Sequence, residues 1–589
     1  MTTRLTFLGA VAAALLAAGC EAETGVGNIG LAVSALGSCP GVTGSDPIPS
    51  IDRVRVMVTA VNRDTQELYN PVDEAFKVKS SITVGGIPAG INNVVTVLGY
   101  APGQTEAGWF ARQRQVRIEQ DATTSLDLVL APLGRLACVT PPNTFTHRVF
   151  STATALGDGT VLVTGGFTKV TAAASTVLEE PSDLALLYSA QTGGPLDPIA
   201  APMTARRAAH AAVFLPITEK DGIKGADGAV LGKSGIVLLI GGANKVELKA
   251  DGIAFATGDA LNSYEIYDVA TKAFHPALKD GTGNPRQMTL KRAFPNVARL
   301  FDNSVLITGG GQWPKDPNPD YANAELWAPW VATGDEKGGL QPFSGNGPIM
   351  KRQHNGAAIA KLEDTAEGLS RYALIGGIST VNADNPGVEI YTQSSQQQKG
   401  VSGVFTALEA KGLPPLFFPA VAPLSGKRFL VVGGIGYKDG KFQAPADSAW
   451  ILQFGRAPSG DTVAVTPARN VAAGCGQRFF HTAMASFDGD RAFVIGGFKD
   501  FTGPAASPNC RWDPERPDTT VSDDPNAKLP EAMSVVAETQ AFAGHRAEPL
   551  PDDTVLVVGG MTTRGAFPEE TGIVQVYAPP TVRLDPTAP

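Results

Sequence analysis

The sequence predicts an all-β protein: a small antiparallel β-sandwich followed by a closed ring of seven similar four-stranded sheets. A short phrase, an apolar run that stops at a glycine pair, recurs seven times after residue 145. The stretch before it, about 28–135, alternates polar and apolar residues without helical periodicity. The 66 glycines and 44 prolines among 589 residues are typical of many short strands joined by turns.

The composition narrows the class of protein further. Hydrophobic residues make up 43% of the chain and charged residues 18%, which is typical of a globular rather than a disordered protein. The net charge of −9, without a run of Lys and Arg, disfavours a nucleic-acid partner.

Residues 1–20 read as a signal peptide. Arg4 supplies a positive charge, and the apolar stretch that follows it to Ala18 is too short to span a bilayer. Ala18-Gly19-Cys20 resembles the cleavage box of bacterial lipoproteins, although Leu16 lies one place early. The resemblance implies a lipid on Cys20 and an anchored protein of the bacterial cell envelope, either periplasmic or at the outer-membrane surface. Ordinary secretion after cleavage near Ala18 is the alternative.

Residues 21–140 are predicted to form the β-sandwich. The stretch "IDRVRVMVTAV" at 51–61 has the alternation of a half-buried strand, and "GIPAG" at 86–90 is a turn between two further strands. The phrase "GIPAG…VTVLGY" resembles immunoglobulin-like and transthyretin-like modules of bacterial surface proteins, which are sandwiches.

Residues 141–589 hold the repeat. The glycine pairs are Gly165-Gly166, Gly241-Gly242, Gly309-Gly310, Gly376-Gly377, Gly433-Gly434, Gly496-Gly497 and Gly559-Gly560. Several are followed by a strand such as "YEIYD" and preceded by basic residues and a histidine, as in "RRAAHAAVF". This order resembles the kelch repeat, and seven copies imply a seven-bladed kelch-type β-propeller. The phrases "GDGT", "DNSV" and "PDDT" suit tight hairpins, and glycine at the end of a strand lets neighbouring backbones approach closely.

The cysteines are expected to pair in an oxidising compartment. If Cys20 carries lipid, four remain, and these allow three connectivities. Cys39–Cys138 and Cys475–Cys510 are favoured because each pair lies within one predicted unit. A metal site is the less favoured alternative, since no C-x-x-C spacing occurs.

Five of the six histidines are predicted to share one place in the repeat: His147, His210, His354, His481 and His545. Residues a blade apart are too distant to share a metal ion, so we expect structural roles and predict no metal, cofactor or catalytic residue. Blade 3 has Pro295 and blade 5 has Pro419 near this place, and blade 6 lacks an obvious E-x-Y-D strand.

The predicted function is a binding or scaffold protein that presents one propeller face to a protein or glycan partner. Trp313 and Tyr437 are candidate contacts on loops after glycine pairs, although either could instead pack against a neighbouring blade. The alternative is a carbohydrate-active enzyme of the sialic-acid mutarotase or sugar-oxidase type with an arginine-lined channel. Its candidate residues are Arg206, Arg292, Arg352 and Arg478. These arginines could equally be the basic position of the repeat and form salt bridges between blades.

Overall fold

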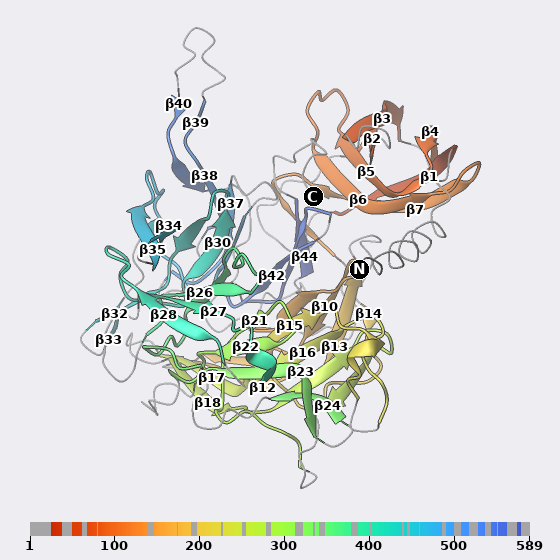
Figure 1. Cartoon of the computed structure of the whole chain (residues 1–589). Helices are drawn as coiled ribbons and strands as arrows, with labels where there is room; N and C mark the ends of the chain where they lie inside the picture. Colours follow the sequence, from red (N-terminus) through yellow and green to blue (C-terminus); the bar gives the residue numbers. More distant parts are fainter. Residues whose placement is uncertain are drawn as a thin grey trace, which may run out of the picture. The chain divides into compact units, whose positions relative to one another are not determined.

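The computed structural model describes residues 25–578 in two compact units (Figure 1). The first unit contains the described residues up to Ala35 and from Ser50 to Leu130. The second unit contains Leu36, Gly37 and the described residues from Ala131 onward. The description omits residues 38–49, 62–67, 79–80, 140–146, 173–174, 190–196, 225–227, 250–254, 278–283, 312–321, 334–335, 341–347, 379–386, 400–401, 439–440, 444–447, 459, 486–490, 500–507, 518–527, 536–542, 551 and 562–573. The predicted signal peptide and Cys20 also lie outside the described residues.

Seven strands of the first unit form a single sheet. They are β1 (Val26–Ala35), β2 (Arg53–Val61), β3 (Leu68–Lys77), β4 (Ile82–Pro88), β5 (Gly90–Tyr100), β6 (Trp109–Ile118) and β7 (Thr123–Pro132). Their order is β3-β2-β5-β6-β7-β1-β4. The pairs β2/β3, β2/β5, β5/β6 and β1/β4 are antiparallel, and β1 pairs with β7 in parallel.

The first unit is all-β as predicted, and the parallel pair of β1 and β7 corrects the purely antiparallel pairing that was expected for the sandwich. The edge strands β3 and β4 contact each other, which brings the sheet close to a barrel. Its core includes Leu31, Val56, Val97 and Phe110, all fully buried. Side chains alternate between the two faces of a strand whether its neighbour runs parallel or antiparallel, so the sequence pattern did not reveal the parallel pair.

The described part of the second unit contains seven four-stranded antiparallel sheets, or blades. Blade 1 is β9 (Thr152–Ala155), β10 (Thr160–Thr164), β13 (Ala185–Ser189) and β14 (Asp197–Pro198). Blade 2 is β15 (Ala211–Leu215), β16 (Ile236–Ile240), β19 (Tyr264–Asp268) and β20 (Ala273–Pro276). Blade 3 is β21 (Asn296–Arg299), β22 (Val305–Thr308), β23 (Glu325–Thr333) and β24 (Glu336–Leu340). Blade 4 is β25 (Ala358–Lys361), β26 (Arg371–Ile375), β27 (Val388–Thr392) and β28 (Val404–Leu408).

The remaining blades follow the same order. Blade 5 is β30 (Ala420–Leu424), β31 (Arg428–Val432), β34 (Ala449–Ala457) and β35 (Gly460–Pro467). Blade 6 is β36 (Thr482–Ala485), β37 (Ala492–Ile495), β38 (Cys510–Asp513) and β41 (Ala532–Val535). Blade 7 is β42 (Arg546–Pro549), β43 (Val555–Val558), β44 (Val574–Tyr577) and, from before blade 1, β8 (Leu136–Cys138).

The blades form a closed ring. Their first strands contact one another in the cycle β9, β15, β21, β25, β30, β36, β42 and back to β9. The ring closes because β8 pairs with β44, so that the last blade takes its outer strand from the start of the unit. The all-β, seven-bladed propeller predicted from the glycine pairs is confirmed.

Additional strands lie in the connections between blade strands. β11 (Phe167–Ala172), β12 (Ser175–Pro181), β17 (Ala243–Lys249) and β18 (Phe255–Ala260) form one four-stranded sheet, called here the insertion sheet. Two smaller sheets contain β29 (Leu416–Phe417), β32 (Ile435–Lys438) and β33 (Lys441–Gln443), and β39 (Arg516–Pro517) and β40 (Lys528–Leu529). Short 3-10 helices span Glu219–Asp221 and Gln397–Lys399, and within the described residues no helix could cross a membrane.

The inner hairpins adopt the predicted tight turns. Gly159, Asn303 and Asp553 have positive φ at 84°, 59° and 67°. One residue earlier, an aspartate accepts hydrogen bonds from the residue after the turn; Asp158, for example, accepts from the N–H and hydroxyl of Thr160. The hairpins turn on one face of the ring, and the glycine pairs lie on the opposite face, where each second strand ends. We call that opposite face the glycine-pair face.

Candidate functional site

The centre of the glycine-pair face is a ring of seven residues with positive φ, one just before the first strand of each blade. They are Phe150, Ala209, Phe294, Gly356, Phe418, Phe480 and Gly544. The N–H of Ala209 donates to the carbonyl of Phe150 over 2.9 Å, and the N–H of Phe294 donates to that of Ala209 over 2.7 Å. Backbone bonds therefore link successive blades around the axis.

Four phenylalanines of this ring pack against one another across the axis. The ring centroids of Phe150 lie 4.9 Å from Phe294 and 4.7 Å from Phe480, and those of Phe418 and Phe480 lie 4.7 Å apart. They belong to one buried cluster with Val149, Phe417, Phe479 and Phe498, which we call the axial cluster. The axis is thus filled by aromatic side chains. The sequence signal was present, because an aromatic residue follows the basic position by two in "RVF", "RAF" and "RFF".

The glycine pairs are required by the contact between blades, as predicted. The N–H of Gly242 in blade 2 donates to the carbonyl of Arg292 in blade 3 over 2.8 Å. Gly241 has a φ of 64°, and a Cβ added there would lie against the same carbonyl oxygen. Any side chain would therefore separate the two blades.

The arginines of the repeat are part of the blade architecture. Arg207, fully buried, donates through Nε to Oε1 of Glu265 over 2.9 Å and through Nη1 to the carbonyl of Gly241 over 2.8 Å. In blade 3, fully buried Arg292 binds Glu325 over 2.9 Å and the carbonyl of Gly309 in the same way. These two salt bridges lie within a blade and not between blades, which corrects the predicted partner of Arg292. The pair of Arg206, which leads into blade 2, with Asp183, which precedes β13 of blade 1, does lie between blades.

Each glutamate also holds the chain that leads into its blade. The N–H of Thr204 donates to Oε2 of Glu265 over 2.7 Å, three residues before Arg207. Thr289 donates in the same way to Glu325 over 2.6 Å, three residues before Arg292. One buried carboxylate therefore binds both the guanidinium and the incoming backbone.

The structure corrects the common place assigned to five histidines. Only His210, His481 and His545 follow the positive-φ residue directly; blades 3 and 5 have Pro295 and Pro419 there. His354 takes the arginine position, where its Nδ1 lies 2.8 Å from the carbonyl oxygen of Gly376. His147 precedes Arg148 by one residue. The sequence alignment therefore placed together histidines that lie three or four positions apart in the blade structure.

His210 is buried and His481 is half-buried, and each contacts a neighbouring blade. His210 Nε2 lies 2.9 Å from Oγ1 of Thr164 and 3.1 Å from Oγ1 of Thr152, both in blade 1. His481 Nε2 lies 3.1 Å from the carbonyl oxygen of Val432 in blade 5. Burial, together with the adjacent arginine, holds the pKa of each imidazole well below its usual value, so both are neutral.

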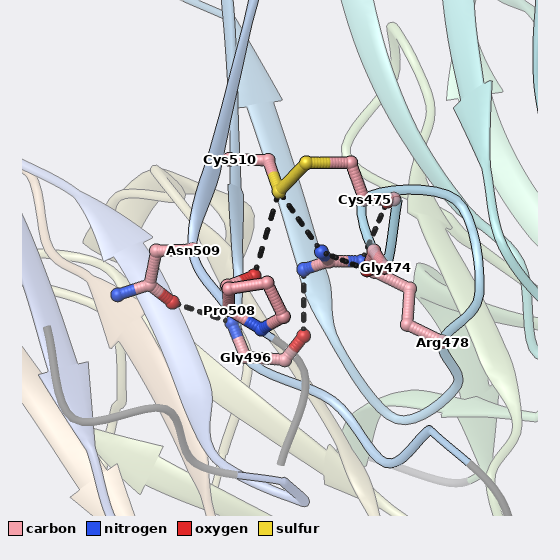
Figure 2. Close-up of a disulfide and its surroundings, with 7 residues drawn as sticks. All are labelled: Gly474, Cys475, Arg478, Gly496, Pro508, Asn509 and Cys510. Atoms are coloured by element: carbon pink, nitrogen blue, oxygen red, sulfur yellow. Dashed lines mark hydrogen bonds between the residues drawn. A yellow bond between two sulfur atoms is a disulfide. The ribbon is translucent and has the colours of Figure 1, made fainter. Parts of the chain in front are cut away.

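Blade 6 contains the predicted Cys475–Cys510 disulfide, with the two Cα atoms 5.9 Å apart (Figure 2). Arg478 donates to the carbonyls of Cys475, Gly474 and Gly496 and, over 3.1 Å, to Sγ of Cys510. Cys138 is also disulfide-bonded, and its predicted partner Cys39 lies outside the described residues.

The sequence-predicted ligand residues are not brought together. Arg292 and Arg478 are fully buried, whereas Arg206 is 70% exposed beside Asp183, and Arg352 is exposed. Trp313 lies outside the described residues, as does the side chain of Tyr437. Among the residues that the structure places, no group of three or more His, Cys, Asp and Glu could hold a metal ion.

The insertion sheet lies on the glycine-pair face, and sequence reasoning missed it. Its inward side chains, which include Leu178, Val246 and Leu248, belong to the axial cluster. Its outward side is charged: Nζ of Lys169 lies 2.8 Å from Oε1 of Glu179, and Ser175 donates to Glu247 over 2.6 Å. This sheet therefore covers part of the axial cluster and presents a polar surface outward.

No protein-family model matches the chain, and no curated protein does. The chain is similar in structure to a fungal alcohol oxidase of the AA5 family in complex with copper, at 14% identity and a TM-score of 0.46, over 76% of this chain and 77% of that one. It is also similar to YjhT, at 13% identity and a TM-score of 0.37, over 67% of this chain and 99% of that one. Similarity at this level supports no inference about activity.

Proposed function

We propose that the chain is a membrane-anchored, extracytoplasmic binding or scaffold protein of the kelch type, whose glycine-pair face binds a protein or glycan partner. The observation that carries this proposal is the insertion sheet. Its apolar side packs against the axial cluster, and its charged side faces outward. Binding residues are concentrated on the connections that a rigid scaffold carries, and the insertion sheet is built from two such connections.

The arginines favour binding over catalysis in an arginine-lined channel. Arg292 and Arg478 donate to carbonyls, a carboxylate and a sulfur inside the blades, and aromatic rings fill the axis beside them. The carbohydrate-active alternative is thereby left with Arg206 and Arg352 as its exposed charges.

The binding surface is tested by charge reversal on the insertion sheet. We expect Lys169→Glu combined with Lys245→Glu to weaken capture of a partner on protein and glycan arrays at least tenfold, because both side chains are exposed on one polar surface. The matched control is Lys272→Glu, an exposed residue of the outer hairpin on the opposite face. Equal capture by all three proteins would contradict the proposed surface.

The anchor is tested separately. Cys20→Ser is expected to release the protein from the membrane fraction and to abolish incorporation of labelled fatty acid. A wild-type protein that is soluble and begins after Ala18 would instead support ordinary secretion.

A further inference from the structure

Cys510 holds the strand position that a glutamate holds in three other blades. In blade 2, Glu265 pairs with Leu239, two residues before the glycine pair. In blade 6, Cys510 pairs with Val494, also two residues before the pair. Glu325 and Glu389 hold the same register in blades 3 and 4. The sequence "CRWD" at 510–513 is therefore the missing E-x-Y-D strand, with Cys in place of Glu and Trp in place of Tyr.

Cys475 holds the position of the backbone donor that binds this glutamate. It precedes Arg478 by three residues, as Thr204 precedes Arg207 and Thr289 precedes Arg292. In blades 2 and 3 the N–H at this position donates to the glutamate. In blade 6 the same two positions are joined by the disulfide (Figure 2).

The arginine of the motif is retained in blade 6. Arg478 is fully buried, its Nη1 donates to the carbonyl of Gly496 as Arg207 does to that of Gly241, and its Nη2 lies 3.1 Å from Sγ of Cys510. A sulfur atom at Cys510 thus receives the contact that a carboxylate receives in the other blades. A nearby arginine favours the thiolate form of a cysteine over the thiol.

We propose that blade 6 is built to stay folded in two redox states, and that its reduced state is held by an ion pair between Arg478 and the Cys510 thiolate. A dithiol reductant supplies the two electrons. One of its thiolates attacks Sγ of Cys475, the S–S bond breaks, and Cys510 leaves as the thiolate beside Arg478. The second thiol of the reductant then closes the reductant's own disulfide and releases Cys475, which takes up a proton. One proton of the dithiol passes to solvent.

The thiolate is tested in the full chain with Cys475→Ala, which leaves Cys510 as a free thiol. Thiolate absorbance near 240 nm is titrated against pH, with Cys475→Ala/Cys510→Ala as the blank that retains every other cysteine. We expect a midpoint below about 7.5, against about 8.5 for an ordinary cysteine. Cys510→Ala, which leaves only Cys475, is expected to titrate at or above the ordinary value. A midpoint at or above 8.5 for Cys510 would overturn the proposal.

A second variant keeps the test independent of the titration. Cys475→Thr/Cys510→Glu recreates the threonine, glutamate and arginine of blades 2 and 3. All proteins carry Cys39→Ser and Cys138→Ser, so that no disulfide other than that of blade 6 responds to reduction. We expect the glutamate variant to keep the melting temperature of the oxidised parent within about 3 °C and to be insensitive to dithiols, whereas Cys475→Ala/Cys510→Ala melts well below both. If the glutamate variant were no more stable than the alanine variant, Cys510 would not stand in for a carboxylate. Unfolding of the Cys39→Ser/Cys138→Ser parent on reduction, in which only the blade 6 disulfide can break, would also refute the proposal.

Discussion

The N–H of Gly560 donates to the carbonyl oxygen of Arg148 over 2.6 Å, and this bond joins the last blade to the first. The same bond joins Gly242 to Arg292 and Gly434 to Arg478 within the ring. The closing junction therefore repeats these internal ones, and at each of them the glycine pair is a contact between blades.

Replacing Gly559 by alanine is expected to destabilise the protein by about 2–4 kcal/mol. Its φ is 71°, and an added Cβ would lie against the carbonyl of Arg148. Gly426→Ala is the control, because Gly426 has a φ of 70° and open space around the added atom. Denaturant unfolding compares the two; equal losses would show that backbone strain alone, and not blade contact, selects glycine.

Two neighbouring arginines are expected to differ sharply in their effect on stability. Arg207→Gln removes the partner of fully buried Glu265 and is expected to cost about 3–5 kcal/mol. Arg206→Gln removes a pair at 3.4 Å whose arginine is 70% exposed, and is expected to change stability by less than about 0.5 kcal/mol. Thermal unfolding measures both. A large loss for Arg206→Gln would assign it a structural role that its exposure does not predict.

The axial cluster is expected to stabilise the ring. Phe480→Ala removes a ring that packs on Phe150 and Phe418, and should cost about 3–5 kcal/mol. Phe301→Ala, on the opposite face and 69% exposed, should leave stability within about 0.5 kcal/mol of wild type. If Phe480→Ala were equally neutral, the aromatic rings would not hold the blades together.

The buried histidines predict a loss of stability at acid pH. The pKa of His210 is well below 6.5 in the folded protein, so its stabilising effect is present above the unfolded value near 6.5 and is lost as pH falls below it. Below pH 6.5, the unfolding free energy of the wild-type protein should fall with decreasing pH more steeply than that of His210→Gln, by about 1.4 kcal/mol per pH unit. The measurement is urea unfolding of both proteins between pH 5 and 7.5, and parallel curves would show that His210 takes up no proton on unfolding.

Features encoded within a few residues could be predicted from the sequence. Gly165-Gly166 and the six other glycine pairs marked the end of the second strand in each blade. The phrase "GDGT" marked a hairpin, and its Gly159 has a positive φ. Cys475 and Cys510 could be paired because both lie within one predicted unit. In each case the residue type is required by its own conformation or its own bond: glycine by positive φ or a close backbone contact, and cysteine by a disulfide.

Features that depend on distant contacts could not be predicted. The strand Leu136–Cys138 carries no pattern of its own, and it pairs with β44 across a separation of 437 residues between Cys138 and Gln575. The insertion sheet takes two strands from a connection in blade 1 and two from a connection in blade 2. Neither connection taken alone predicts a four-stranded sheet. The site was predicted less well than the fold, because Arg292 looks the same in sequence whether it lines a channel or binds Glu325.

The most direct test of the closed ring is hydrogen exchange of the full chain, compared between residues 136–139 and 574–577. Closure predicts that the two segments exchange at the same slow rate, because the N–H of Val139 donates to the carbonyl of Val574 over 2.9 Å and the strands unfold together. Rapid exchange at 136–139 with protection at 574–577 would contradict closure of the propeller by β8.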